Sequence, residues 1–397
     1  MKTKLQALFQ SEGYRIEMIQ SNGQVAQATL SWDKRQKPRC SCGKKMRINR
    51  IERQAASDLP LGCASVVVVA YDGVQGFCKI CQVYETRRPL EIVPNHHATL
   101  RFMRHVSLLC RWLPVSRVCE VVPVTPSTAA RYDRYILKTE LPDPCLDDLG
   151  AIIIDEKHLG KSGGFITLVL NARSGELLHL AEGRSQESLD GFFAKLTDKQ
   201  KAAILAVAID RSNAYRCAVE SHLPHAQIVF DKFHLIANFS DVIDAVRRRS
   251  YSQASEADRA FIKGQRFNLL RNAENLSEKG RNELQTLLEA NADLSAAYVL
   301  KDQLKEIWTY TYTASAAKAL TRWVEMAVAT GIRELGRFAK GLERAKDEIL
   351  AFCKHRITSA KIEAFNGIVA RVVRNACGLS NLDYLFLKLR QHSLQKW

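Results

Sequence analysis

The stretch that most constrains the fold of this chain is Ala151–Asp155, where four apolar residues run into a carboxylate. Three of the four are isoleucine, and such an unbroken β-branched run is typical of a strand buried on both faces of a sheet. Two further segments, Ile204–Asp210 and Ala226–Asp231, also end on an aspartate. Ligands of open α/β sheets bind outside the carboxyl ends of the strands, so we expect these acids to meet at one edge. We interpret this edge as a site for divalent metal.

The order of predicted elements around these strands indicates the fold class. Tight turns make the first three strands antiparallel, and helical crossovers make the later strands parallel. The resulting order βββαβαβα is that of a ribonuclease H-like α/β core with a mixed sheet. The predicted strands are 151–155, 165–172, 176–181, 204–210 and 227–231, and the predicted helices between them are 188–196 and 213–223.

Two cysteine pairs mark the amino-terminal region. Cys40 and Cys42 form the first pair, and Cys78 and Cys81 form the second, with a strand 64–71 and a turn at Asp72-Gly73 predicted between them. This layout predicts a small zinc ribbon, in which four Zn–S bonds replace a core too small to fold alone. The first pair is one residue shorter than the second, and four unrelated thiols are the alternative. We expect Cys63, on an apolar strand, to be a packed thiol.

Three helices are predicted next, over 98–113, 116–121 and 126–138, followed by a linker at Leu141–Pro144. A tight break between the last two favours a helix-turn-helix that binds DNA, and an ordinary helical connector is the alternative. The third helix would offer four side chains to a DNA groove, namely Ser127, Thr128, Arg131 and Arg134.

From Phe233 to about Lys354 the sequence is helix-forming, with Trp308 and Trp323 expected in its core. A further helix then carries Glu363 on the face opposite its apolar stripe, with Arg371 and Arg374 one to three turns later. Cleavage of a phosphodiester by two cations needs hard carboxylate oxygens to hold Mg²⁺ or Mn²⁺. Asp155, Asp210 and Glu363 are the candidate ligands, and the two arginines are candidate phosphate contacts.

The charge composition indicates which class of binding partner to expect. Lys and Arg outnumber Asp and Glu by 58 to 42, giving a formal net charge of +16, which favours a polyanion such as nucleic acid over a surface charged only for solubility. No run approaches the roughly 18 apolar residues of a membrane helix, and no signal peptide is recognisable. We expect a cytoplasmic protein whose 11 cysteines are thiols or metal ligands.

The chain resembles the ISL-three family of bacterial insertion-sequence transposases, which are DDE enzymes with an amino-terminal zinc ribbon. The resemblance covers nearly the whole length and depends on a succession of segments, none of which is specific alone: 153–157, Glu182–Leu189, Ile209–Tyr215, Leu223–His234, Lys361–Asn366 and Arg374–Gly378. It implies catalytic Asp155, Asp210 and Glu363, a helical insertion before the glutamate, and Mg²⁺ dependence. It also implies double-stranded DNA as substrate, both terminal inverted repeats and target, and action at the bacterial nucleoid.

Each acid has a competing interpretation. Glu156 is the rival of Asp155, because adjacent strand residues point to opposite faces and only one is expected to be a ligand. Asp231 is expected to cap the following helix rather than to bind metal. Glu363 is a solvated helix acid in the alternative interpretation. Three further residues are candidate phosphate contacts, and the sequence favours none of them over the others: Lys157, Arg184 and Lys232.

The sequence predicts four regions: a zinc-ribbon region 1–94, a helix-turn-helix region 95–142, a core 143–239 with 355–397, and a helical insertion 240–354. The predicted function is metal-dependent cleavage and strand transfer at transposon ends, by a homodimer that pairs two ends. The alternative is a DNA-binding regulator with an inactive nuclease-like core, and the presence of all three acids argues against it. An RNA-directed nuclease of the same fold is disfavoured because no RNA-binding module is recognisable.

Overall fold

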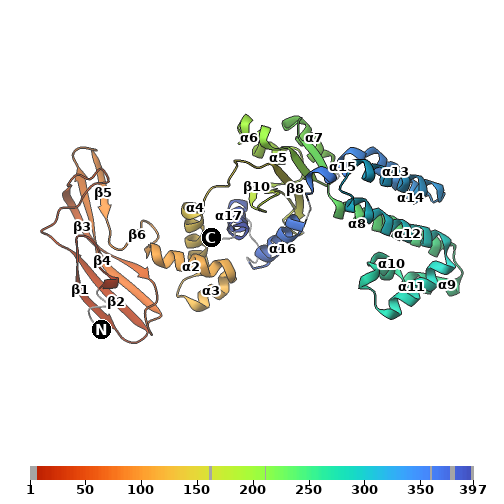
Figure 1. Cartoon of the computed structure of the whole chain (residues 1–397). Coiled ribbons are helices and arrows are strands. Elements are labelled where there is room, and N and C mark those ends of the chain that lie inside the picture. The colour runs from red at the N-terminus through yellow and green to blue at the C-terminus, as the bar shows by residue number, and fades with distance from the viewer. Residues whose placement is uncertain (1–6, 161–162, 211, 358–359, 376–380, 395–397) are drawn as a thin grey trace. The chain divides into compact units, whose positions relative to one another are not determined.

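A computed structural model describes residues 7–160, 163–210, 212–357, 360–375 and 381–394. The chain divides into two compact units, one formed by residues 1–143 with 370–397 and the other by residues 144–369 (Figure 1). The division therefore falls within one helix, α16 (Ala360–Asn375), whose end belongs to the first unit.

The first unit begins with a seven-stranded sheet in the order β1-β2-β4-β3-β7-β6, with β5 paired to β4. The strands are β1 (Tyr14–Ser21), β2 (Val25–Trp32), β3 (Arg47–Asp58), β4 (Val66–Cys78), β5 (Val83–Arg87), β6 (Ile92–Val93) and β7 (Ala98–Thr99). The sheet buries an apolar cluster of its own that includes Leu30, Val69 and Tyr71. This core is larger than that of the small ribbon expected from the sequence.

The predicted turn at Asp72-Gly73 is wrong. Strand β4, which is 13 residues long, includes both residues and pairs with β3 along nearly its full length. Two glycines are needed in the strand because of close neighbours: a Cβ at Gly76 would meet the Met46 Cβ at 2.7 Å, and one at Gly73 would meet the Gln54 side chain at 3.1 Å. Glycine here marks close packing inside a strand rather than a reversal of the chain.

Three helices follow, as predicted: α2 (Leu100–Trp112), α3 (Val115–Val121) and α4 (Pro126–Glu140). Thr125 caps α4, with its side chain accepting a hydrogen bond from the Thr128 N–H, and Pro126 occupies the first helical position, where its missing N–H costs little. Helix α17 (Leu382–Ser393), near the carboxyl end of the chain, packs against α4 and α2.

A buried ion pair joins α17 to α4. The Asp133 carboxylate is fully buried and lies 3.0 Å from the Lys388 Nζ. It also accepts hydrogen bonds from the Ser107 hydroxyl at 2.7 Å and the Tyr384 hydroxyl at 2.5 Å. Lys388 in turn donates to the Cys110 carbonyl at 2.9 Å. The charges are thus paired and hydrogen-bonded, which is the condition for keeping them away from water.

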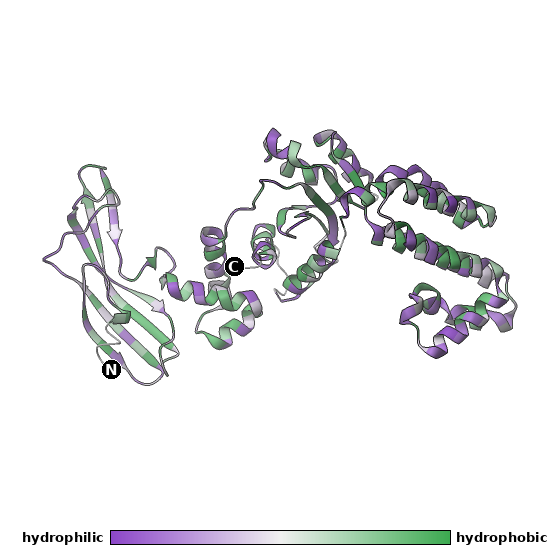
Figure 2. Ribbon diagram, in the orientation of Figure 1, coloured by the Kyte–Doolittle hydropathy of each residue, from purple (hydrophilic) through white to green (hydrophobic). Residues whose placement is uncertain are grey.

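The second unit contains a five-stranded mixed sheet in the order β10-β9-β8-β11-β12. Its strands are β8 (Ala151–His158), β9 (Phe165–Asn171), β10 (Leu177–Glu182), β11 (Ala206–Ile209) and β12 (Gln227–Phe230). The pairs of β8 with β9 and β9 with β10 are antiparallel, and those of β8 with β11 and β11 with β12 are parallel. The predicted mixed sheet is confirmed, and its strands are strongly hydrophobic (Figure 2).

Short helices connect the later strands: α5 (Glu187–Phe193), α6 (Asp198–Ala203) and α7 (Asn213–His222). Strand β11 is shorter than the predicted 204–210, helix α6 was not predicted, and strand β8 is longer than predicted. Strand β8 continues past Asp155 to His158 because it remains paired with β9 as far as Phe165. Asp155 therefore lies inside β8 rather than at its end, opposite the point where β11 stops.

The segment from Lys232 to His355 contains helices only, as predicted. They are α8 (Lys232–Gln253), α9 (Glu256–Gly264), α10 (Arg266–Leu270), η1 (Ala273–Asn275), α11 (Glu278–Ala290), α12 (Ala292–Glu306), η2 (Ile307–Thr309), α13 (Thr313–Ala329), α14 (Arg333–Arg344) and α15 (Lys346–His355). Trp323 is buried between the Phe239 and Phe338 rings, and its Nε1 donates to the Leu300 carbonyl at 2.8 Å. Trp308 is also buried, which confirms the expected packing role of both.

Among the described residues, no helix is long and apolar enough to cross a membrane. The four predicted regions do not coincide with the two compact units, since the units place residues 370–397 with the amino-terminal part. The four-part division stays a prediction.

The buried ion pair generates a stability prediction. Asp133→Ala leaves the Lys388 ammonium buried without a counter-charge, so we expect the free energy of unfolding of this unit to fall by about 3–5 kcal/mol. The control Glu120→Ala breaks the exposed Arg117–Glu120 pair, 2.9 Å long, in the same unit, and should cost less than about 1 kcal/mol. Urea unfolding followed by circular dichroism measures both, and similar small losses in the two variants would contradict the prediction.

Candidate active site

The parallel pairing of three strands brings three aspartates to one edge of the sheet. Ala208 lies opposite Ile153, and Ile209 lies opposite Phe230. Continuing the same register by one or two residues sets Asp210 beside both Asp155 and Asp231. All three line a small cavity of about 10 Å³, close to the smallest that holds one water.

Asp155 is held from two sides. The carboxylate is 7% exposed, and its Oδ2 accepts a hydrogen bond of 2.9 Å from the Asn366 amide on α16. The His234 Nε2 on α8 lies 3.8 Å from the other oxygen and 3.6 Å from Asp231. Asp210 accepts a hydrogen bond of 2.9 Å from the Ser212 N–H. Two helices that are far apart in sequence thus converge on the carboxylate of β8.

The aspartates repel one another. Burial raises the pKa of Asp155, and the negative charge of Asp210 raises it further, while the Asn366 amide and His234 act in the opposite direction. Burial also raises the pKa of Glu156, again with contributions from Asp210 and Asp155. The cavity therefore carries more negative charge than the described side chains around it neutralise.

Glu156 lies on the other face of the sheet from Asp155. Its cross-strand neighbour is Thr167, whose hydroxyl is 2.9 Å from the Tyr215 hydroxyl on α7, whereas Asp155 contacts α16. Two buried oxygens here, the Glu156 Oε2 and the Asn366 Oδ1, have no hydrogen-bond partner within the described part of the chain. The clustered carboxylates of Asp155, Asp210 and Asp231 are what a cation would relieve, so the donor set of the cavity fits a hard divalent ion.

Glu363 is not in this group. Its side chain is exposed on α16, one turn before Asn366. Among the described residues, the cysteines below are the one group of three or more metal-ligating side chains whose ligand atoms all lie within 4.8 Å of one another. The structure therefore brings Asp155 and Asp210 together, and it places Glu363 on the helix that contacts Asp155 without closing the triad.

Asp231 caps helix α8, as expected. Its side chain accepts a hydrogen bond from the Phe233 N–H while its own backbone N–H donates to the Ile209 carbonyl at 3.2 Å. One carboxylate oxygen of Asp231 still lies close to His234. The cap therefore explains the residue, and its place in the cavity keeps a metal role open to test.

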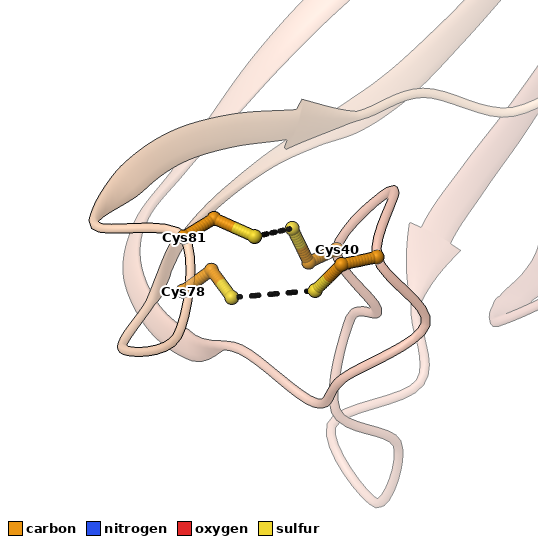
Figure 3. A group of neighbouring side chains, drawn as sticks. Cys40, Cys78 and Cys81 are labelled. Carbon is orange, nitrogen blue, oxygen red and sulfur yellow. Dashed lines mark hydrogen bonds between the residues drawn. The ribbon is translucent and has the colours of Figure 1, made fainter.

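The four predicted cysteines gather at one end of the first unit's sheet. The Cys40 and Cys81 sulfurs lie 3.9 Å apart (Figure 3), and the Cys42 and Cys78 sulfurs lie 3.7 Å apart. The backbone N–H of Cys81 lowers the pKa of the Cys78 thiol to about 7, against the opposing effect of burial. Four convergent thiols with one near its ionisation point are the donor set of a tetrahedral zinc site.

Glu85, beside the cluster, and Cys63, outside it, were not described correctly by the sequence analysis. Glu85 accepts hydrogen bonds from the Cys40 Sγ at 3.1 Å and from the Ser41 N–H and hydroxyl, a contact that no sequence spacing indicated. Cys63 is exposed, so its predicted packing is wrong. The reason is that it lies in a tight turn closed by the Leu61–Ala64 bridge rather than inside a strand.

The predicted DNA-contacting residues lie on two helices. Ser127 and Thr128 are in the first turn of α4, and Arg131 is exposed one turn later. Arg134 is half-buried instead, with its guanidinium 5.1 Å from the Tyr384 ring. Arg371 and Arg374 are exposed on the last turns of α16. Residues 376–378 of the last family segment lie outside the described residues.

Comparison with known proteins identifies the family. The family model for ISL-three proteins, described as a transposase, matches residues 152–389, which is more than half of the chain and includes the whole mixed sheet and helix α16.

Curated relatives agree. The chain is 32% identical over 317 residues to the transposase for insertion sequence element IS1001 of Bordetella parapertussis, covering 79% of this chain and 78% of that protein. It is 26% identical over 310 residues to the transposase for insertion sequence element IS1557 of Mycobacterium tuberculosis, covering 72% and 70% respectively. The chain therefore belongs to the ISL-three family of insertion-sequence transposases.

Proposed function

We propose that this transposase is a DDE enzyme that cleaves and transfers DNA strands with the help of divalent metal held by Asp155, Asp210 and Glu363. The observation that carries the proposal is the Asp155–Asp210 edge, where two carboxylates from parallel strands share a small cavity in spite of their mutual repulsion. Repulsive pairs of this kind are retained where they hold a cation or exchange protons.

Each residue has a defined part. Asp155 and Asp210 present oxygens from the rigid sheet, and Asn366 orients the Asp155 carboxylate through its amide. Glu363 is one helical turn from Asn366 and would complete the ligand set by a change of rotamer or a small movement of α16. When bound, Mg²⁺ or Mn²⁺ would stabilise the charge on the attacking and leaving oxygens of a phosphodiester.

The strand order supports a ribonuclease H-like core. Three antiparallel strands followed by two parallel ones, in the order β10-β9-β8-β11-β12, place the first and fourth strands of the core side by side. Residues 143–239 with 355–397 would form this core, and the helices of 240–354 would be an insertion that grips transposon ends or a partner copy.

The amino-terminal regions would recognise DNA. The cysteine cluster supports structural zinc in region 1–94, and the three helices α2, α3 and α4 support a helix-turn-helix in region 95–142. Terminal inverted repeats come in pairs, so we propose a homodimer that holds two ends at the nucleoid, one in each copy.

Nicking of a supercoiled plasmid that carries the cognate ends tests the catalytic proposal. Asp210→Asn keeps an oxygen for the Ser212 N–H but removes the charge that holds metal. We expect nicking with Mg²⁺ or Mn²⁺ to fall at least about a hundredfold, and Asp155→Asn to do the same. Agarose gels of the open-circular product measure the rate.

The matched control is Asp241→Asn, which removes one charge from an exposed acid on α8 and should leave nicking within about twofold. Wild-type protein that binds the ends but never nicks them, across a range of metals, would overturn the proposal and favour the DNA-binding regulator. Gel-shift affinity for the ends separates the two outcomes.

Glu363 has a separate prediction. Because its side chain is exposed, Glu363→Gln should leave the thermal unfolding midpoint unchanged within about 2 °C. Nicking should still fall at least about a hundredfold if the carboxylate joins the metal site. A Glu363→Gln protein with wild-type nicking would remove this residue from the proposed triad while leaving Asp155 and Asp210 in place.

The zinc proposal is tested by metal content. Purified protein should contain about one zinc per chain, and Cys78→Ser should lose it and lower the thermal midpoint. Cys63→Ser is the matched control, since that thiol is exposed and outside the cluster. Elemental analysis by mass spectrometry measures the ratio, and equal zinc in the two variants would refute the site.

A further inference from the structure

A second cavity, of about 380 Å³, lies in the first unit. Its walls come from α2, the start of α4, the end of α16 and α17. Its volume falls within the roughly 300–1,000 Å³ typical of small-molecule sites. None of the proposed catalytic or zinc-binding residues lines it.

The lining of this cavity includes several cationic side chains. Arg111, Arg134, Arg371 and Lys388 line it, and no carboxylate does among the described residues. Lys388 is neutralised by Asp133. The Arg111 and Arg134 Nε atoms are both buried and have no hydrogen-bond partner in the described part of the chain. A buried guanidinium N–H without an acceptor is costly, so the cavity is built to receive an anion.

The cationic side chains also act on His392, which lines the same cavity. Burial and the positive charges of Lys388, Arg111 and Arg371 lower the pKa of His392 to about 4. The imidazole is therefore neutral at physiological pH. The direction of this effect supports an excess of positive charge in the cavity.

The lining also includes apolar and aromatic side chains. Leu113, Val115 and Val372 line it together with Trp112, whose side chain is 62% exposed although it is large and apolar. The Trp112 ring meets the His392 ring edge-on at 5.9 Å and has the Arg111 guanidinium 5.1 Å from its centre. An exposed tryptophan next to arginines is the arrangement on which a nucleic-acid base stacks.

We propose that this cavity binds a nucleoside phosphate, with the phosphate on Arg111, Arg134 and Arg371 and the base against Trp112, and that its source is one unpaired nucleotide of a DNA strand. The DNA source rests on the proposed function. A base inside a duplex is paired and stacked, so only a flipped, bulged or single-stranded nucleotide can place its base in a cavity of this size. A free nucleoside phosphate shares the same chemistry.

Binding in the presence of EDTA tests the proposal without cleavage. The probes are two fluorescein-labelled 20-base-pair duplexes of one sequence, one fully paired and one with a single bulged adenosine, and unlabelled dAMP. Fluorescence anisotropy should show the bulged duplex binding about tenfold more tightly than the paired one. Trp112→Ala and Arg371→Gln should reduce this preference to less than about twofold.

Both substituted side chains are exposed, so the variants should fold, and circular dichroism melts verify it. Lys199→Gln is the charge-matched control, since this exposed lysine on α6 lies outside the cavity, and it should keep the tenfold preference. A preference that survives in both Trp112→Ala and Arg371→Gln would overturn the proposal.

Titration with dAMP distinguishes the sources. Suppose that the two duplexes bind equally. Saturable quenching of tryptophan fluorescence by dAMP that is lost in Arg371→Gln would then support the cavity as a site for a free nucleotide. Equal duplex binding without any response to dAMP would overturn the proposal. Because these measurements contain no metal, their failure leaves the nicking result of the aspartate variants unaffected, and the reverse also holds.

Discussion

The second unit holds like charges together where two parallel strands of its mixed sheet end, and the packing of its apolar strands is what makes this possible. Asp155 and Asp210 are brought together by the register of β8 against β11, and that register is fixed because β-branched residues on both faces of these strands must be buried. The folding energy of the sheet thus overcomes the repulsion between two carboxylates, and the Asn366 amide removes part of the remaining cost.

Much of this unit could be predicted from sequence because its signals are local. Apolar runs such as Ile152–Ile154 predict buried strands. The aspartates that follow these runs predict which residues meet at the carboxyl ends of the strands. Asn366 could be placed on the same helical face as Glu363, but its hydrogen bond to Asp155 could not, since the two residues are 211 positions apart. The length of β8 was also missed, because it depends on pairing with β9 rather than on the residues after Asp155.

The first unit was harder to predict because its determinants are not local. Strand β4 continues through Asp72 and Gly73 because it pairs with β3. Its glycines pack against the side chain of Gln54, which is in β3, and that of Met46, which comes just before β3. The contacts of Glu85 with Cys40 and Ser41 also join residues that are far apart in the sequence, separated by 45 and 44 positions. Asp133 and Lys388 were not expected to meet, although their ion pair attaches α17 to the three-helix region. The cysteine cluster was predictable because metal-ligand spacing is itself a local signal.

Two places in the described chain hold charge that their own surroundings do not neutralise, and the signs are opposite. The cavity beside Asp155 gathers three aspartate side chains, and the cavity beside Arg111 has donors without acceptors. A protein gains nothing in stability from either, because the first brings like charges together and the second leaves polar atoms buried and unsatisfied. The proposed ligands would account for both: a hard cation would satisfy the first and a phosphate the second. A transposase needs both kinds of ligand, since it must activate one phosphodiester while it holds the rest of the strand by its phosphates and bases.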